Sequence, residues 1–121
     1  MSGFVTLQTV HAGTGKPRAV GHESDYETVA ASQTNQALGV TGKKGDFLAR
    51  LIVTPATTTP GIVQIKDGAD TAITVFVGGA ASITQLTTFE IPLFLYSRTG
   101  AWQITTGANV SVVATGSFLP T

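Results

Sequence analysis

The sequence predicts an all-β protein, a β-sandwich of about seven to nine strands with an extended N-terminal arm. Three observations support this prediction. Between residues 47 and 118, short runs of strand-forming residues recur, and Gly, Pro, Asp and Asn separate them. Within the runs the apolar residues mostly occupy every second position, which is the period of a strand with one buried face. Twenty threonines and fourteen glycines favour strands joined by tight turns over helices.

Turn residues bound six apolar runs in this stretch, and each run is expected to be a strand. The predicted ranges are 47–54, 62–66, 71–77, 89–96, 101–105 and 110–118. The second and third should form a hairpin, because Asp67 to Asp70 is the kind of short loop that joins antiparallel strands. A single sheet this apolar would leave one apolar face in water, so two packed sheets are favoured.

Alternation assigns side chains to the faces of these strands. Ile73, Val75 and Val77 should line one face of the third strand, with Thr74 and Phe76 on the other.

The later strands give three further expectations. Pro92 has no backbone N–H, so strand 89–96 should lie at a sheet edge or carry a bulge. Glu90 should point outward from it. Trp102 shares a strand face with Ile104 and should therefore be a core residue.

Residues 1–46 are expected to form the arm and residues 47–121 the core of one domain. The arm has few periodic apolar positions, yet residues 1–50 carry nine of the fourteen charges. One to three strands are expected from it. In residues 26–38 the apolar residues follow neither the helical nor the strand period clearly, so a short helix and an irregular strand both fit.

Composition excludes several classes of function. Seven basic and seven acidic residues give no net charge, so no overall field favours nucleic acid, an anionic membrane or an acidic substrate. The chain has no cysteine, no apolar run long enough to span a membrane and no signal-peptide pattern, so we expect a soluble protein that is not exported by that route. With only 12% charged residues, part of the surface is expected to be covered by a partner.

No motif of the chain predicts an enzyme, a metal site or a cofactor. Residues 12–16 (AGTGK) resemble a phosphate-binding loop, but the glycine spacing is too short and Pro17 follows the lysine, so a flexible basic loop is favoured. His11 and His22 lie near acidic residues, but two histidines are too few for the usual zinc sets and a solvated acidic turn is favoured at residues 22–27. Asp67 and Asp70 are interpreted as hairpin-loop residues.

The chain also lacks a group of residues with catalytic roles. No nucleophile elbow is present, and the sequence pairs Glu90 with no second acid. The basic pair Lys43 and Lys44 is interpreted as a solvated turn, and the sparse aromatic residues as core residues that do not stack on bases.

Three segments carry a resemblance to a known class of protein. They are residues 60–68 (PGIVQIKDG), 72–79 (AITVFVGG) and 100–110 (GAWQITTGANV). Together they resemble small virion proteins of tailed bacteriophages, over roughly residues 45–118. In size and character the chain is most similar to the capsid decoration, or cement, proteins, which are β-sandwich or jelly-roll modules.

The resemblance implies a structural protein on the surface of the phage head, made in the host cytoplasm and without a cofactor. Its partners would be the major capsid protein and further copies of itself, as dimers or trimers, and the arm would extend along the shell. Nucleic acid and membrane are not expected as partners. In this interpretation Lys16, Arg18, Lys43 and Lys44 meet acidic groups on the capsid.

An alternative from another class is a tail-fibre or baseplate module that binds a receptor or a carbohydrate. Such a module should expose aromatic residues on a loop or a sheet face. The candidates are Trp102, Tyr96 and Tyr26. Because the first two lie in predicted strands, the sequence favours the structural role.

Overall fold

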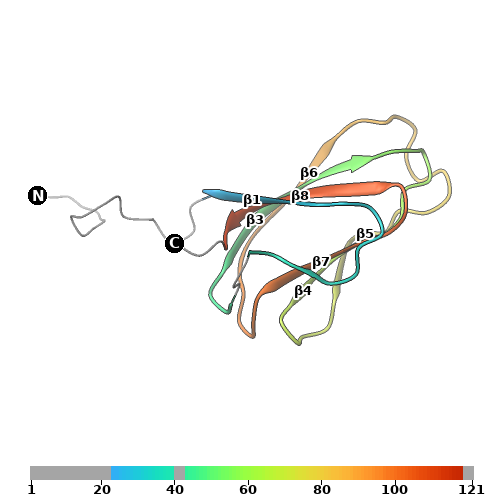
Figure 1. Ribbon diagram of the computed structural model, residues 1–121. Helices are drawn as coiled ribbons and strands as arrows, with labels where there is room; N and C mark the ends of the chain where they lie inside the picture. The colour runs from blue at the N-terminus through green and yellow to red at the C-terminus, as the bar shows by residue number, and fades with distance from the viewer. Residues whose placement is uncertain (1–22, 40–42, 119–121) are drawn as a thin grey trace, which may run out of the picture.

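The computed structural model describes residues 23–39 and 43–118, and this part of the chain forms two antiparallel β-sheets packed face to face (Figure 1). The strands are β1 (Asp25–Val29), β2 (Gln36–Ala37), β3 (Phe47–Pro55), β4 (Val63–Asp67), β5 (Ile73–Phe76), β6 (Phe89–Tyr96), β7 (Trp102–Thr106) and β8 (Val110–Ser117). The described residues contain no helix, and so none that would be long and apolar enough to cross a membrane. The predicted β-sandwich is confirmed.

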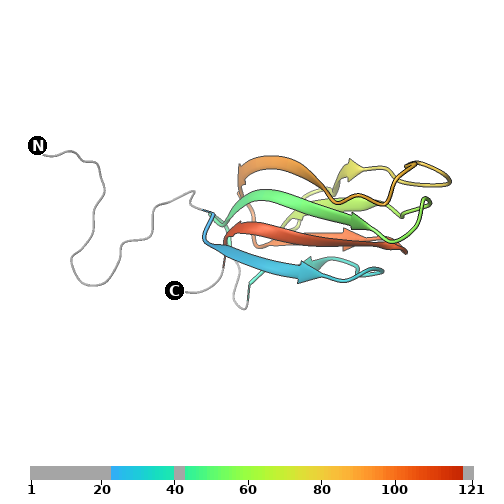
Figure 2. The ribbon, with the colours of Figure 1, turned by 90° about the horizontal axis from the view of Figure 1, so that it is seen from above.

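The strand order is that of a jelly roll. One sheet, here called sheet A, has the order β1-β8-β3-β6, and the other, sheet B, has the order β2-β7-β4-β5. Strands β1 and β8, β2 and β7, β3 and β6, and β4 and β5 are all hydrogen-bonded pairs, so the first half of the chain forms a long antiparallel ribbon with the second half. Winding that ribbon into two layers gives an eight-stranded jelly roll. In Figure 2 the four strands of sheet A lie side by side in the front layer.

The core lies between the sheets and is built from alternate residues of each strand. Thirteen apolar side chains form one buried cluster: Val29, Leu38, Leu48, Leu51, Val53, Val63, Ile65, Trp102, Ile104, Val110, Val112, Ala114 and Phe118. Trp102 is 2% exposed, and its ring N–H donates a hydrogen bond to the Asp46 carbonyl at 3.1 Å. The prediction that Trp102 is a core residue is therefore confirmed.

All six strands predicted from the later part of the chain are present, with boundaries within two residues, and 89–96 coincides with β6. The earlier residues contribute two more strands. Of the alternatives for residues 26–38, the strand is confirmed and the helix is wrong. The solvated acidic turn expected at residues 22–27 is replaced, from Asp25 onward, by β1. Val29 and Leu38 are completely buried, because β1 and β2 extend the two sheets over the core.

Strand β5 departs from simple alternation. Val63 pairs with Phe76 while Gln64 pairs with Thr74, so Val75 is an extra residue, a β-bulge. A bulge lets two successive side chains lie on one side of a strand. Val75 and Phe76 both pack against the core, whereas Val77 is exposed. The expected face assignment of this strand is therefore wrong at Phe76 and Val77.

Both features that Pro92 predicts are present in β6. The strand is at the edge of sheet A, where the absent N–H leaves no ladder bond unmade. Leu93 and Phe94 together stand opposite the single residue Ala49 of β3, which makes a second bulge. Glu90 points outward as expected, and it pairs across from Ile52.

Candidate interaction surfaces

Three aromatic side chains are exposed on the outer face of sheet A. Tyr26 of β1 is 71% exposed, and Phe94 and Tyr96 of β6 are 55% and 47% exposed. Tyr26 pairs with Thr115 and Tyr96 pairs with Phe47 across neighbouring strands, so both lie on the outer side of the same sheet. We call this surface the aromatic face. The expectation that the aromatic residues are core residues is wrong at these three positions.

Phe47 forms the base of the aromatic face at the β6 edge. Its ring lies 5.0 Å from that of Tyr96 and 6.4 Å from that of Phe94, measured between centroids. Phe94 has a φ of 54°, a left-handed conformation that bulky side chains rarely adopt. The bulge thus holds an exposed aromatic ring in an unfavourable backbone conformation, which is typical of functional sites.

Arg50 lies at the middle of the aromatic face. Its guanidinium is 2.9 Å from a carboxylate oxygen of Glu23 and 3.0 Å from one of Glu90, and it lies 5.3 Å from the centroid of the Phe94 ring. Hydrogen bonds to Glu90 and then to Glu23 raise the pKa of Arg50 above its ordinary value. Glu23 also accepts a hydrogen bond from the Thr115 hydroxyl. Both carboxylates are therefore engaged in holding Arg50.

Lys43 and Lys44 lie at the end of the sandwich next to the turn that follows β6. Both are exposed. The Lys43 carbonyl accepts a hydrogen bond from the Ser97 hydroxyl at 3.2 Å, and the Lys43 N–H donates to the Asp46 carboxylate at 2.9 Å. These bonds place the lysine turn beside Tyr96 and Arg98. The other two predicted contact residues, Lys16 and Arg18, lie outside the described residues, as do His11, His22 and residues 12–16.

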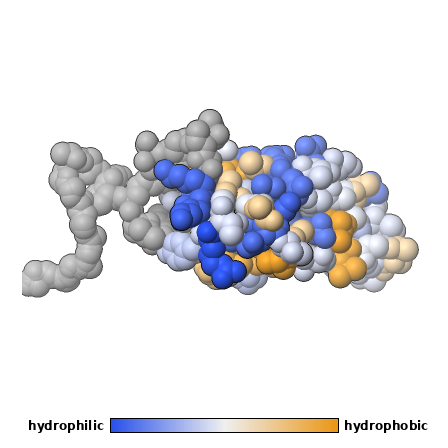
Figure 3. Space-filling view, turned by 90° about the horizontal axis from the view of Figure 1, so that it is seen from below, coloured by the Kyte–Doolittle hydropathy of each residue, from blue (hydrophilic) through white to orange (hydrophobic). Residues whose placement is uncertain are grey.

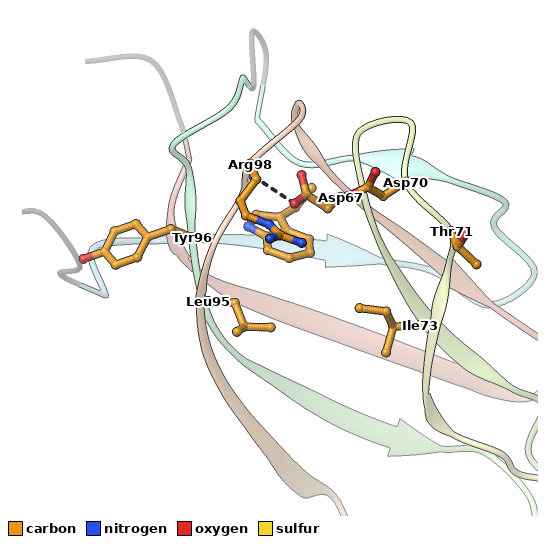
Figure 4. A pocket seen from close by; sticks show the side chains of 8 residues that line it. Asp67, Asp70, Thr71, Ile73, Leu95, Tyr96 and Arg98 are labelled. Carbon is orange, nitrogen blue, oxygen red and sulfur yellow. Dashed lines mark hydrogen bonds between the residues drawn. The ribbon is translucent and has the colours of Figure 1, made fainter.

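A pocket of about 500 Å³ opens between the edge strands β5 and β6. Asp67, Asp70, Thr71 and Ile73 line one side, Leu95, Tyr96 and Arg98 line the other, and Trp102 completes the lining. Figure 4 shows the two sides facing each other, with the ring of Tyr96 turned away from the space between them. We call the edge of the sandwich that is formed by β5 and β6, with this pocket at one end, the open edge.

Asp67 is a structural residue of this pocket. Its carboxylate accepts hydrogen bonds from the backbone N–H groups of Arg98 at 2.8 Å and Thr99 at 3.0 Å. Desolvation acts to raise the pKa of Asp67, but hydrogen bonds from the Thr99, Arg98 and Gly100 backbone outweigh it and lower the pKa below the ordinary value. The interpretation of Asp67 as a loop residue is thus refined: it ends β4 and anchors the next turn of the chain.

Asp70 and Arg98 carry the remaining charges of the pocket, one on each side. Within the described part of the chain, neither side chain forms a salt bridge or a side-chain hydrogen bond. Ile73 and Leu95 lie on the two sides of the same pocket and are 49% and 39% exposed. The pocket therefore combines apolar walls with one free acceptor and one free donor of opposite charge.

The described residues contain no group of three or more His, Cys, Asp and Glu side chains that could hold a metal ion. Four carboxylates accept hydrogen bonds within the protein. Glu23 and Glu90 accept from the Arg50 guanidinium, Glu27 accepts from the Gly39 N–H after β2, and Asp67 accepts from the Arg98 N–H.

The fold defines the class of the protein, an eight-stranded jelly-roll β-sandwich with two candidate interaction surfaces. Comparison with known proteins adds no relative: no family model, no curated protein and no solved structure matches the chain.

The sequence pointed to Tyr26 and Tyr96 as candidate exposed aromatic residues, but it did not point to Phe94 or to the placement of Asp70 and Arg98 across one pocket. Phe94 had an available signal, because alternation along strand 89–96 places Phe94 and Tyr96 on the same face as the outward-pointing Glu90. Asp70 and Arg98 had none. They lie in two turns that only the packing of the sheets brings to opposite sides of one pocket.

Proposed function

We propose that this chain is a structural virion protein of the capsid decoration type, which binds the major capsid protein lattice and stabilises a phage head. The observation that carries the proposal is the aromatic face. Three exposed aromatic side chains lie on one sheet face beside an exposed lysine turn. Aromatic residues gathered on a surface are typical of protein interfaces, where they supply much of the binding free energy.

The charges support a contact of mixed character. Residues 1–22 contain Lys16 and Arg18 and no acidic residue, and Lys43 and Lys44 are exposed at the end of the sandwich near Tyr96. Acidic groups on a capsid would meet these cations around an apolar centre. Such an arrangement speeds association and sets orientation, while the aromatic contacts supply affinity.

The jelly-roll fold is consistent with this role and does not by itself argue for it. Viral capsid proteins and lectins both use the fold. The specific support is the similarity of residues 60–68, 72–79 and 100–110 to small virion proteins of tailed phages, together with a surface that carries few charges.

The aromatic face also favours the second candidate, a tail-fibre or baseplate module that binds a receptor or a carbohydrate. Exposed aromatic residues on a sheet face are the feature that this alternative requires. Tyr26 and Tyr96 provide it. The two candidates therefore differ in the partner that the face contacts, and the same variants test both.

The test is occupancy on purified heads that lack the decoration protein. Replacing Phe94 and Tyr96 together with serine should lower occupancy at least about tenfold, the effect of losing roughly 1.4 kcal/mol of binding free energy. Deleting residues 1–20 should leave the sandwich folded and weaken attachment, most clearly at raised salt if Lys16 and Arg18 contribute.

Gln103→Ser is the control, because Gln103 lies in β7 between the buried Trp102 and Ile104 and so faces the outer side of sheet B, away from the aromatic face. It should leave occupancy unchanged. Full occupancy by the Phe94 and Tyr96 double variant would contradict the proposal. If heads never bind the wild-type chain while an oligosaccharide array does, the tail-module candidate replaces it.

A further inference from the structure

The open edge is the most apolar exposed region of the described residues. Of seven large hydrophobic side chains that are substantially exposed, six belong to β5, β6 or the connection between them: Ile73, Val77, Leu86, Phe94, Leu95 and Tyr96. In Figure 3 the hydrophobic groups form separate patches, and the strongest of them lie in the lower half of the view. Exposed apolar side chains gathered at one edge mark an interaction site.

The pocket at one end of this edge has a charge pattern that is complementary to itself. Asp70 lies on the β5 side and Arg98 on the β6 side, and Ile73 and Leu95 lie on the same two sides further along the strands (Figure 4). A twofold axis parallel to the strands turns one copy over, so that its β5 side meets the β6 side of the other copy. Asp70 of each copy then faces Arg98 of the second, and Ile73 of each copy faces Leu95 of the second.

We propose that the open edge is the dimerisation surface of this protein, and that its occupant is a second copy of the chain, held by two reciprocal Asp70–Arg98 pairs beside two reciprocal contacts of Ile73 with Leu95. A contact of this isologous type is the commonest form of homo-oligomer. The proposal does not rest on capsid binding, and it leaves the aromatic face, on the outer side of sheet A, free for another partner.

The backbone of β6 argues against the other twofold arrangement, in which β6 pairs with β6 of the second copy and continues the sheet. Pro92 provides no N–H, and the bulge at Leu93 and Phe94 breaks the regular spacing of the ladder. Prolines and bulges on edge strands prevent such pairing. Contact through side chains is therefore favoured over sheet continuation.

The decisive experiment is a charge exchange between two variants of the full chain, Asp70→Arg and Arg98→Asp. In a homodimer of either variant, both reciprocal pairs become like-charged, and each variant alone should dimerise at least about tenfold more weakly than the wild type. An equimolar mixture should recover dimers. In a mixed dimer the two arginines of the first variant face the two aspartates of the second, so both reciprocal pairs are again of opposite charge. Analytical ultracentrifugation over a concentration series measures the dimer dissociation constant of each sample.

Lys66→Glu is the control for altered net charge, since Lys66 lies in β4 on the outer face of sheet B and not in the pocket. It should dimerise like the wild type. Circular dichroism verifies that each variant is folded. If a reversal unfolds the chain, Asp70→Asn and Arg98→Gln replace it and should each weaken the dimer less.

Three results would overturn the proposal: a wild-type chain that stays monomeric up to millimolar concentration, a trimer in place of a dimer, or a variant mixture that dimerises no better than either variant alone. A failure here leaves the capsid proposal standing, because head occupancy is measured separately and with different variants.

Discussion

The two long edges of the sandwich differ in how the gap between the sheets is closed. At the β1–β2 edge the chain crosses directly from one sheet to the other, and Glu27 bonds both the Gly39 N–H and the Gln36 side-chain amide at 2.8 Å. The Thr106 hydroxyl adds a bond to the Ala30 carbonyl at 2.6 Å. At the β5–β6 edge the two strands end their sheets and share no ladder, and the apolar pocket remains open between them.

This difference separates a structural edge from an edge that is available to a partner. Polar side chains close the first edge because the backbone there turns between the layers and its N–H and C=O groups need partners. Strands β5 and β6 are joined instead by a longer connection, residues 77–88, and the rings of Phe76 and Phe89, 5.3 Å apart between centroids, are in contact across the two sheets at one end. Apolar surface left exposed in this way is stabilised only when another surface covers it.

The largest expected effect on stability comes from truncating Trp102. Trp102→Ala removes the side chain between the pocket and the core, and the free energy of unfolding should fall by about 3 to 5 kcal/mol, as for other large buried aromatics. Chemical denaturation measures it. A change of a few tenths of a kcal/mol would mean that Trp102 contributes little to the core and that its burial has another purpose.

Removing the Glu27 hydrogen bonds at the β1–β2 edge should have the next largest effect on stability. Glu27→Ala deletes an acceptor of two hydrogen bonds and should lower the free energy of unfolding by about 1.5 to 3 kcal/mol. The matched control is Glu90→Ala, whose carboxylate is more exposed and pairs with Arg50, and which should cost about 0 to 1 kcal/mol. Equal effects at the two glutamates would contradict the assignment of Glu27 to edge closure.

The smallest expected effect is a pH dependence of stability that comes from Asp67 in the pocket. Because the folded protein holds the pKa of Asp67 below its ordinary value, the stabilisation from this carboxylate is fully present above about pH 4 to 5 and is lost as the pH falls through the folded-state pKa. Burial raises the pKa of Asp46, which changes stability with pH in the opposite direction. The contribution of Asp67 is therefore the difference in free energy of unfolding between the wild type and Asp67→Asn.

That difference in free energy of unfolding should be largest near neutral pH and should shrink as the solution is acidified. Thermal unfolding followed at several pH values supplies it. A difference that stays constant from neutral pH to about pH 2 would show that Asp67 acts through its shape and not through its charge.

The sequence by itself determined the fold class and most strand positions. Alternation and turn residues are local properties, so the runs that became β3, β6 and β8 could be recognised without a partner strand. The absent N–H of Pro92 likewise indicated an edge and a bulge from one residue alone. Trp102 was assigned to the core because it shares a strand face with Ile104.

The tertiary structure decided which residues the protein exposes. A bulge changes the face of every residue beyond it, and its place depends on the register with a neighbouring strand, so alternation failed at Phe76 and Val77. The winding of the ribbon decided that β5 and β6 lie at one edge and that β1 and β2 close the other. Asp70 and Arg98 became neighbours across a pocket for the same reason: their proximity results from long-range packing, which no local pattern in the chain encodes.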